Sequence, residues 1–403
     1  MTSFNKTPRG RFSRFLGPVF SLPALRGRTF WLIAIFAPFQ IQAAPDAIIT
    51  EFRDDEILTR LPNTATEIFR ETDSPKEAGD RLQMLITQAR ASGDPRYLGY
   101  AQTLINRWPE EQLTHRLRVL RATLRQSLHQ FGSARADLEQ VISSSSDNQQ
   151  RIQARLTLAN LELVQGRYTE AGRHCQALQS AYPGLIAKSC LASVQARTSD
   201  PQKAYRNLAQ QLAKSTGRQQ ADSTSRLWTE GTLGDIAAQA GLSEAELHWR
   251  RVLQASPSDL YTRAQLADWL LEQDQLERVL TLTHGFEAVD TLAVIRAIAM
   301  KRMGHPGSDE LNRRLRQRFE EARWRGTLLH ARDVARFQLD VENQPHDALR
   351  LAIENWESQR EPLDTRLLLR SAQTSGDRPQ YQRVSEWLSQ QGQSDARFPE
   401  FKQ

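Results

Sequence analysis

Small side chains recur at a fixed step through the middle of the chain, each within an apolar pattern of helical spacing. The step is twelve residues in three pairs, Ala122 with Ala134, Ala159 with Ala171 and Ala192 with Ala204. Each pair puts one small residue on each of two consecutive helices, and a small residue at a crossing lets helix axes approach to about 8–10 Å. Two helices joined by a short turn cannot bury their apolar faces alone. The pattern therefore predicts helical hairpins stacked on one shared core.

Two copies of the hairpin are nearly complete. The copy that contains Ala159 and Ala171 adds Gly166 at the turn and Pro183 after the second helix. Another copy has Gly234, Gly241, Ala245 and Pro257 at the places of Ala159, Gly166, Ala171 and Pro183. This unit of about 34 residues resembles the tetratricopeptide repeat. The resemblance implies an all-α fold, a right-handed superhelical solenoid of antiparallel helix pairs. Ala, Leu, Arg, Gln and Glu dominate the chain, which favours helix throughout.

Weaker copies extend the prediction in both directions. We expect further hairpins over 82–105, from Leu266 onward with Val279 where alanine is usual, over 328–357 and over 367–388, the last being a polar-faced cap for the array. The intervals between copies vary, because polar stretches at 143–148 and 214–225 can loop out between helices.

The amino-terminal segment has a different composition. Six basic residues precede an apolar run over 30–39, and small residues follow it up to Ala43. This order is typical of a secretory signal peptide, so we expect residues 1–43 to be cleaved after Ala43 and the protein to be periplasmic. The run is half the length of a membrane span and contains Pro38, which makes a retained tether the alternative. Residues 44–75, punctuated by prolines, are predicted to form an arm before a repeat domain over 76–403.

Removing the signal peptide changes the charge of the protein. The full chain has 53 Lys and Arg against 47 Asp and Glu, and residues 1–43 contain six bases and no acid. The mature chain therefore has equal numbers of each, so its composition gives no support for a nucleic-acid partner. The run Arg313–Arg318 is the one local candidate for an anionic partner, although mixed charges of this kind usually form a solvated helix face.

Two cysteines stand fifteen residues apart on consecutive predicted helices. Cys175 and Cys190 are either a disulfide, which an oxidising compartment permits, or two buried small hydrophobes at helix interfaces. Their spacing does not decide between the two. A metal site is not expected, because His174 and Cys175 point about 100° apart on a helix and no second ligand lies one turn away.

Catalytic motifs are missing from the sequence. It has no glycine-rich phosphate loop, no paired histidines on one helical turn and no Gly-x-Ser-x-Gly elbow, and its eight histidines are scattered singly. We expect no enzyme activity and no cofactor. A hydrolase acting on cell-wall or peptide substrates stays open as an alternative, since carboxylates gathered in one cleft would support it and carboxylates scattered over outer faces would not.

The resemblance places a ligand groove on the concave surface, which the first helix of each hairpin forms. Some members of the family hold a peptide carboxylate with paired Lys and Asn; only Asn160 matches, and Val119, Leu156 and Ser189 stand where Lys would be. The expected groove residues are Arg116, Thr123, Gln126, Leu156, Asn160, Ser193, Arg197, Asp235 and Asp268.

A groove of small, apolar and weakly polar residues suits an extended segment or a helix of another protein. We therefore expect a non-catalytic, exported interaction scaffold with a protein partner and no stable membrane span in its mature form. The alternative is a membrane-tethered subunit of an envelope assembly or export system, held by residues 30–39.

Overall fold

The computed structural model describes residues 74–215, 222–324 and 331–400, and every regular element in these ranges is a helix. The predicted signal peptide lies outside the described residues, as does the predicted arm apart from Ser74 and Pro75. Ser74 is the N-cap of the first described helix, where its hydroxyl accepts a hydrogen bond from Glu77 N at 3.2 Å. Pro75 occupies the first turn, where a missing N–H costs nothing. The repeat domain therefore begins with a well-capped helix.

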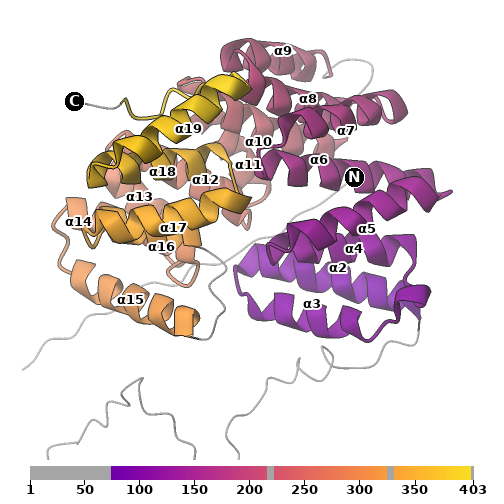
Figure 1. The fold of residues 1–403 in the computed structure, drawn as a ribbon, viewed down its shortest axis with the longest axis horizontal. Helices are drawn as coiled ribbons and strands as arrows, with labels where there is room; N and C mark the ends of the chain where they lie inside the picture. The colour runs from indigo at the N-terminus through magenta and orange to yellow at the C-terminus, as the bar shows by residue number, and fades with distance from the viewer. Residues whose placement is uncertain (1–73, 216–221, 325–330, 401–403) are drawn as a thin grey trace, which may run out of the picture. The chain divides into compact units, whose positions relative to one another are not determined.

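Antiparallel helix pairs follow one another along the described chain (Figure 1). Their bounds are α2 (Pro75–Ser92) with α3 (Arg96–Asn106), α4 (His115–Ser127) with α5 (Phe131–Ser144), α6 (Asn148–Val164) with α7 (Tyr168–Ala181), α8 (Leu185–Thr198) with α9 (Pro201–Lys214), α10 (Ser223–Gln239) with α11 (Glu244–Ala255), α12 (Leu260–Glu272) with α13 (Leu276–Thr283), α14 (Asp290–Arg302) with α15 (Ser308–Trp324), α16 (Ala331–Asp340) with α17 (Pro345–Ser358), and α18 (Pro362–Ser375) with α19 (Arg378–Gln391). A short 3-10 helix, Glu110–Gln112, precedes α4. None of the helices described has both the length and the apolar character needed to span a bilayer.

The turn within a pair has a recurring backbone conformation. One residue with positive φ reverses the chain in every described pair except α8–α9. Glycine adopts this left-handed region without strain, and Asn and Asp tolerate it better than most residues. The residues concerned are Gly93, His129, Gly166, Gly241, Asp274, Gly304, Asn343 and Gly376. The predicted turn glycines, Gly166 and Gly241, therefore belong to a feature that runs through nearly the whole described array.

The small residues that predicted the hairpins lie in the core. Ala159 and Ala171 have no exposed surface, and neither have Ala122 and Ala134. Helices α6 and α7 pack along each other as the step of twelve residues requires. The prediction of an all-α array of antiparallel pairs is confirmed.

Gly234 shows why one crossing needs no side chain at all. A methyl group on its Cα would lie 2.5 Å from Nε1 and 2.6 Å from Cδ1 of Trp249, a residue with only 1% of its surface exposed. The indole of Trp249 fills the space against α10 that an alanine side chain would need. The same indole donates a hydrogen bond from Nε1 to Asp235 Oδ1 at 3.1 Å.

The pair α14–α15 departs from the small-residue pattern. Helix α14 is apolar on almost every side, and its residues from Leu292 to Ile295 are buried. Its partner α15 buries Leu311, Leu315 and Phe319 and no alanine. Helices α13 and α19 likewise bury Val279 and Val384, whereas the second helices of the other pairs bury an alanine. Larger side chains at this crossing explain why the step of twelve did not reveal the pair.

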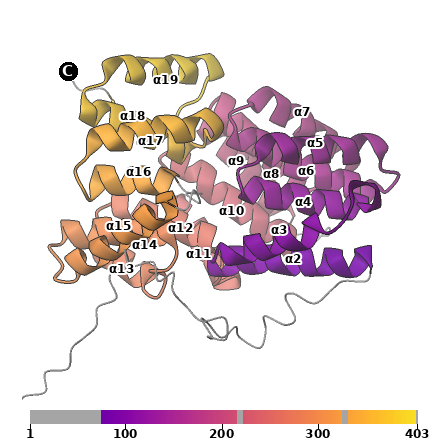
Figure 2. The ribbon, with the colours of Figure 1, turned by 60° about the horizontal axis from the view of Figure 1, so that its bottom comes forward.

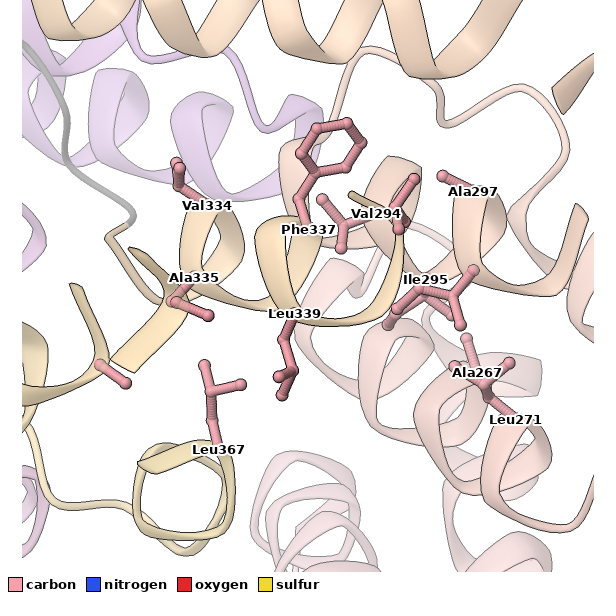
Figure 3. Packing of buried hydrophobic residues seen from close by; sticks show 14 of the residues in the cluster. Ala267, Leu271, Val294, Ile295, Ala297, Val334, Ala335, Phe337, Leu339 and Leu367 are labelled. Carbon is pink, nitrogen blue, oxygen red and sulfur yellow. The ribbon is translucent and has the colours of Figure 1, made fainter. Parts of the chain in front are cut away.

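The core of the later pairs joins side chains from successive first helices. Figure 3 shows Leu271 of α12, Ile295 of α14, Leu339 of α16 and Leu367 of α18 in one cluster. The helices of the last two pairs are stacked in chain order in both views of the ribbon (Figures 1 and 2). The shared core that a repeat array needs is therefore continuous over these pairs.

The last pair also contacts a pair far away in sequence. The backbone N–H of Arg360, just before α18, donates to the carbonyl oxygen of Val164 at 2.7 Å. The ring of Trp387 in α19 lies 6.0 Å, between centroids, from that of Tyr168 in α7. The expected terminal cap thus packs against the third pair, in addition to its own neighbour.

Residues 393–400, which we call the C-terminal clasp, extend this contact. Tyr168 Oη donates to Gln393 Oε1 at 2.9 Å, and Gln239 Nε2 donates to Ser394 O at 2.7 Å. The N–H of Ala396 donates in turn to Gln239 O at 2.9 Å. The clasp therefore ties the end of the described chain to α7 and α10.

Candidate binding cavity

The first helices of several pairs face a common cavity of about 540 Å³, which we call the inner cavity. Its walls come from α2, α6, α8, α10 and the start of α12, and Glu361 at the N-cap of α18 completes them. The volume falls within the range of about 300–1,000 Å³ that is common for ligand pockets. The lining combines aliphatic and aromatic side chains with a few polar ones, among them Leu156, Asn160, Ser193, Leu227, Trp228 and Tyr261.

Two aromatic side chains in this cavity are accessible. Trp228 is 41% exposed and Tyr261 is 53% exposed, unusually high values for large apolar residues of this protein. Both belong to the cavity wall, where they offer flat apolar surface to a ligand. Tyr261 is also held in place, because its hydroxyl donates to Asp235 Oδ2 at 3.0 Å.

A smaller pocket of about 70 Å³, which we call the charged pocket, adjoins the inner cavity. The two share Arg197, Asp235, Tyr261 and Glu361. The remaining lining of the charged pocket comes from α10, α11, α12, α14, α16, α18 and the clasp. Much of it is ionic, including Asp268, Arg332, Arg336, Arg366, Arg370 and Arg397.

Asp268 is the centre of the ion pairs in the charged pocket. It is 2% exposed, and its carboxylate pairs with the guanidinium groups of Arg336 and Arg366. Burial alone would raise the pKa of Asp268, but these two cations hold it well below its usual value. The sequence predicted this residue as a groove position open to a ligand, whereas the structure uses it to join α12 to α16 and α18.

Asp235 has the opposite electrostatic environment. Burial raises its pKa to about 6, and the hydrogen bonds from Trp249 and Tyr261 offset only part of that rise. The ring of Tyr261 is accessible, but burial of its hydroxyl group and the neighbouring Asp235 raise the pKa of that hydroxyl well above its ordinary value. Both carboxylate oxygens of Asp235 are already occupied by protein donors.

The carboxylates of this region do gather in one place, which is the arrangement that a hydrolase would need. Each one, however, bonds to a protein group. Asp235 accepts from Trp249 and Tyr261, and Asp268 pairs with two arginines. Glu361 caps α18 and lies 3.9 Å from Arg332. These bonds give the carboxylates structural roles, and they favour binding over acid–base catalysis as the use of the cavity.

The structure places the nine predicted groove residues in two groups. Leu156, Asn160 and Ser193 line the inner cavity, Arg197 and Asp235 line both cavities, and Asp268 lines the charged pocket. The other three lie on α4 and line neither of them. Arg116 pairs with Asp80 of α2 at 2.7 Å, Thr123 bonds to its own helix, and Gln126 is half-buried.

At the positions where some members of the family have lysine, most side chains of this protein do not face the inner cavity. Val119 is buried in the core, and Ser189 is fully buried with its hydroxyl 3.1 Å from that of Thr229. Of the three, only Leu156 reaches the inner cavity. A lysine–asparagine grip on a carboxylate is therefore not built at these positions.

Sequence reasoning missed Arg90 and Glu361, which line the inner cavity from the first and the last pair. These two residues reach the cavity because helix pairs that are distant in sequence contact each other. Gly93, after α2, lies close to Leu260 and Val289, and the last pair returns to the third. A local pattern holds no signal for such contacts.

Cys175 and Cys190 form a disulfide that links α7 to α8, with their Cα atoms 5.5 Å apart. The bond therefore joins the third pair to the fourth, and Cys190 also lines the inner cavity. Among the residues that the structure describes, no group of three or more His, Cys, Asp or Glu side chains is placed to hold a metal ion.

The basic run in α15 is neutralised by neighbouring acids. Arg313 and Arg314 both pair with Glu310 of the same helix, and Arg316 pairs with Glu342 at 2.8 Å. Arg318 pairs with Asp290, also at 2.8 Å. Because each of these arginines has an acidic partner, the structure favours a solvated helix face here over a patch for an anionic partner.

The comparison with known families agrees with this architecture. Residues 69–183 match the model of the tetratricopeptide repeat-like domain, and this range contains the first three helix pairs, α2 to α7. No curated protein matches the chain. The later pairs continue the same arrangement of buried crossings and left-handed turns. The first three pairs thus match the tetratricopeptide repeat-like domain, and the described chain as a whole is an all-helical solenoid built from paired helices.

Proposed function

We propose that the protein is a non-catalytic scaffold, exported to the periplasm, that binds a segment of a partner protein in the inner cavity. The observation that carries this proposal is the cavity itself, a space of about 540 Å³ lined mainly by first helices and containing accessible aromatic surface. A cavity of this size suits a short extended segment better than a folded domain. Proteins with this repeat architecture typically serve as interaction scaffolds, which supports the same function.

The export of the protein rests on residues 1–43, with their basic, apolar and small-residue regions. The disulfide between Cys175 and Cys190 supports it, because such bonds persist in oxidising compartments. Fractionation tests this part of the proposal. A soluble periplasmic chain beginning at Ala44 supports export with cleavage, whereas a chain that stays with membranes at its full mass supports the tethered alternative.

The binding surface can be tested by a crosslinking pull-down of the tagged protein from its own cell envelope. Asn160→Arg places a large cation in the inner cavity, so we expect it to abolish recovery of the partner. Asn207→Arg is the matched control, because Asn207 is exposed on α9 and lines neither cavity. A partner that is lost only from Asn160→Arg supports the proposal, and a partner recovered equally with both variants would show that another surface binds it.

A further inference from the structure

The charged side chains of the inner cavity are compensated within the protein. Three carboxylates line it, those of Asp235, Asp259 and Glu361, together with two arginines, Arg90 and Arg197. Burial raises the pKa of Asp235, and the positive charge of Arg197 is one of the nearby groups that offset part of that rise. Arg90 is exposed, so water solvates its charge. The lining therefore presents no excess of positive charge to a ligand.

The three carboxylates already have roles within the fold. Both oxygens of Asp235 accept hydrogen bonds from protein groups. Asp259 caps α12, where its Oδ1 accepts from Thr262 N at 2.9 Å, and Glu361 caps α18. A cationic ligand would have to compete with these bonds, and an anionic ligand would meet like charges. An uncharged ligand avoids both costs.

Trp228 of α10 offers a large apolar surface to this cavity, with 41% of the residue exposed. Other tryptophans form aromatic pairs, Trp249 with Trp269 at 6.3 Å and Trp356 with Trp387 at 5.1 Å between ring centroids. No ring of another described residue forms such a pair with Trp228. Tryptophan is enriched among the residues that dominate binding energy, because its ring buries a large area. The indole of Trp228 is therefore available to pack against a ligand.

Tyr261 of α12 supplies a second ring, held in a fixed orientation. The residue is 53% exposed, yet its hydroxyl donates to Asp235 Oδ2 at 3.0 Å. Asp235 is held in turn by the bond from Nε1 of Trp249, whose side chain is buried in the core. These bonds orient the ring of Tyr261 before a ligand arrives, which lowers the entropic cost of binding.

The surface next to the two rings is aliphatic or weakly polar. Leu156 of α6 and Leu227 of α10 line the same cavity, and both are half-buried, so each still exposes apolar surface. Asn160 and Ser193 add uncharged groups that can donate to and accept from a peptide backbone. The lining as a whole suits an apolar group on an uncharged stretch of chain.

We infer that the inner cavity recognises an uncharged stretch of the partner and holds one of its large apolar side chains, aromatic or branched aliphatic, against Trp228 and Tyr261. This inference rests on the proposed function and names the chemistry of the segment. A charged side chain at the same place would lose its hydration without gaining an ionic partner. Because the affinity comes from burial of apolar surface, it should depend little on salt.

Peptide libraries test this chemistry on the full mature protein. Three libraries of nonapeptides share a background of Gly, Ser and Asn and an amidated C-terminus, and each is immobilised through an N-terminal biotin. They differ at two central positions, which are Phe or Leu in the apolar library, Glu in the second and Lys in the third. By surface plasmon resonance we expect the apolar library to bind about tenfold more tightly than either charged library. Its affinity should change by less than about twofold between low and high salt.

Matched variants assign the binding to the cavity. Trp228→Ala should weaken binding of the apolar library about tenfold and leave the charged libraries unaffected. Trp324→Ala is the control, because Trp324 is 74% exposed at the end of α15 and lines neither cavity. Trp228→Phe keeps an aromatic ring and should retain most of the affinity. Far-UV circular dichroism checks that each variant is folded.

The outcomes separate this inference from the proposed function. Tighter binding of either charged library, or an affinity for the apolar library that Trp228→Ala leaves unchanged, would overturn the inferred chemistry. If none of the libraries binds while Asn160→Arg still loses the partner in the envelope pull-down, the inference is wrong and the proposed function stands. An intramolecular crosslink from a benzophenone at position 228 to residues 44–73 would show that this chain, and not a partner, supplies the occupant, which would overturn the inference.

Discussion

Substituting Gly234 by alanine tests whether close helix crossings determine this fold. The added methyl group would lie 2.5, 2.6 and 2.9 Å from three atoms of the Trp249 indole, where normal contacts are about 3.5–4.0 Å. The ring must therefore move by about 1 Å in a fully buried site. Such a movement also weakens the hydrogen bond from Trp249 to Asp235, which is 3.1 Å long.

The expected magnitude follows from three contributions. Overpacking a well-packed core costs about 1–3 kcal/mol, and a weakened hydrogen bond adds about 1 kcal/mol. Replacing glycine by alanine within a helix returns about 1 kcal/mol. We therefore expect Gly234→Ala to lower the free energy of unfolding by about 1–3 kcal/mol, measured by urea unfolding followed by far-UV circular dichroism.

The same helix supplies a control of opposite sign. A methyl group on Gly231 would meet only Val252 Cγ2, at 4.0 Å, which is an ordinary contact. Gly231→Ala should therefore stabilise the protein by about 0.5–1 kcal/mol through helix propensity alone. If both variants shift stability in the same direction by similar amounts, the crossing at Gly234 does not have the role that we assign to it.

Three further predictions concern other parts of the array. Replacing Cys175 and Cys190 by alanine should cost about 3 kcal/mol of unfolding free energy for a separation of 15 residues, and reductant should then affect only the wild type. Burial raises the pKa of Asp235 from 3.8 to about 6, so the folded state keeps its proton longer than the unfolded state, and stability is lost as pH rises through this window. Urea unfolding at several pH values should therefore show Asp235→Asn gaining stability relative to wild type from about pH 4 to about pH 6, and a constant difference would refute the assignment. Gln239→Leu leaves the carbonyl oxygens of Ala196 and Ser394 without their donor, so hydrogen exchange should become faster over the clasp while the first three pairs keep their protection.

The local elements of this fold were accessible from sequence because their causes are local. Ala159 and Ala171 lie on the two helices of one pair, and Gly166 lies in the turn between those helices. The step of twelve residues therefore corresponds to a helix pair in the structure. The sequence pattern did not predict the pair α14–α15, because Leu311 and Leu315 replace the small side chain in its second helix. A pattern based on one residue size detects only the crossings that use that size.

The candidate site was only partly accessible, for a different physical reason. Helical spacing predicted which face of α6, α8 and α10 is turned inward, and Asn160, Ser193 and Asp235 do line the inner cavity. The same reasoning put Arg116 in the groove, although the structure pairs it with Asp80. Contacts between distant pairs decide which of the inward positions line the same cavity. One such contact is the packing of α18 and α19 against the third pair.

Asp268 is the clearest example of a residue whose role could not be predicted from the sequence. Its position in α12 is that of a groove residue, but arginines that follow it by many residues in sequence, Arg336 and Arg366, neutralise it. No property of α12 alone predicts these partners. Ser193, in the corresponding position on α8, lines the inner cavity as the sequence predicted.

The central claim is that the partner binds inside, on the first helices, and not on the outer face of the array. Site-specific photocrosslinking in the native envelope tests it most directly, with a benzophenone amino acid in place of Trp228 or of Leu247. Trp228 lines the inner cavity, whereas Leu247 is 49% exposed on α11 and lines neither cavity. The account predicts a crosslinked partner from position 228 and none from position 247, and a partner captured only from position 247 would contradict it.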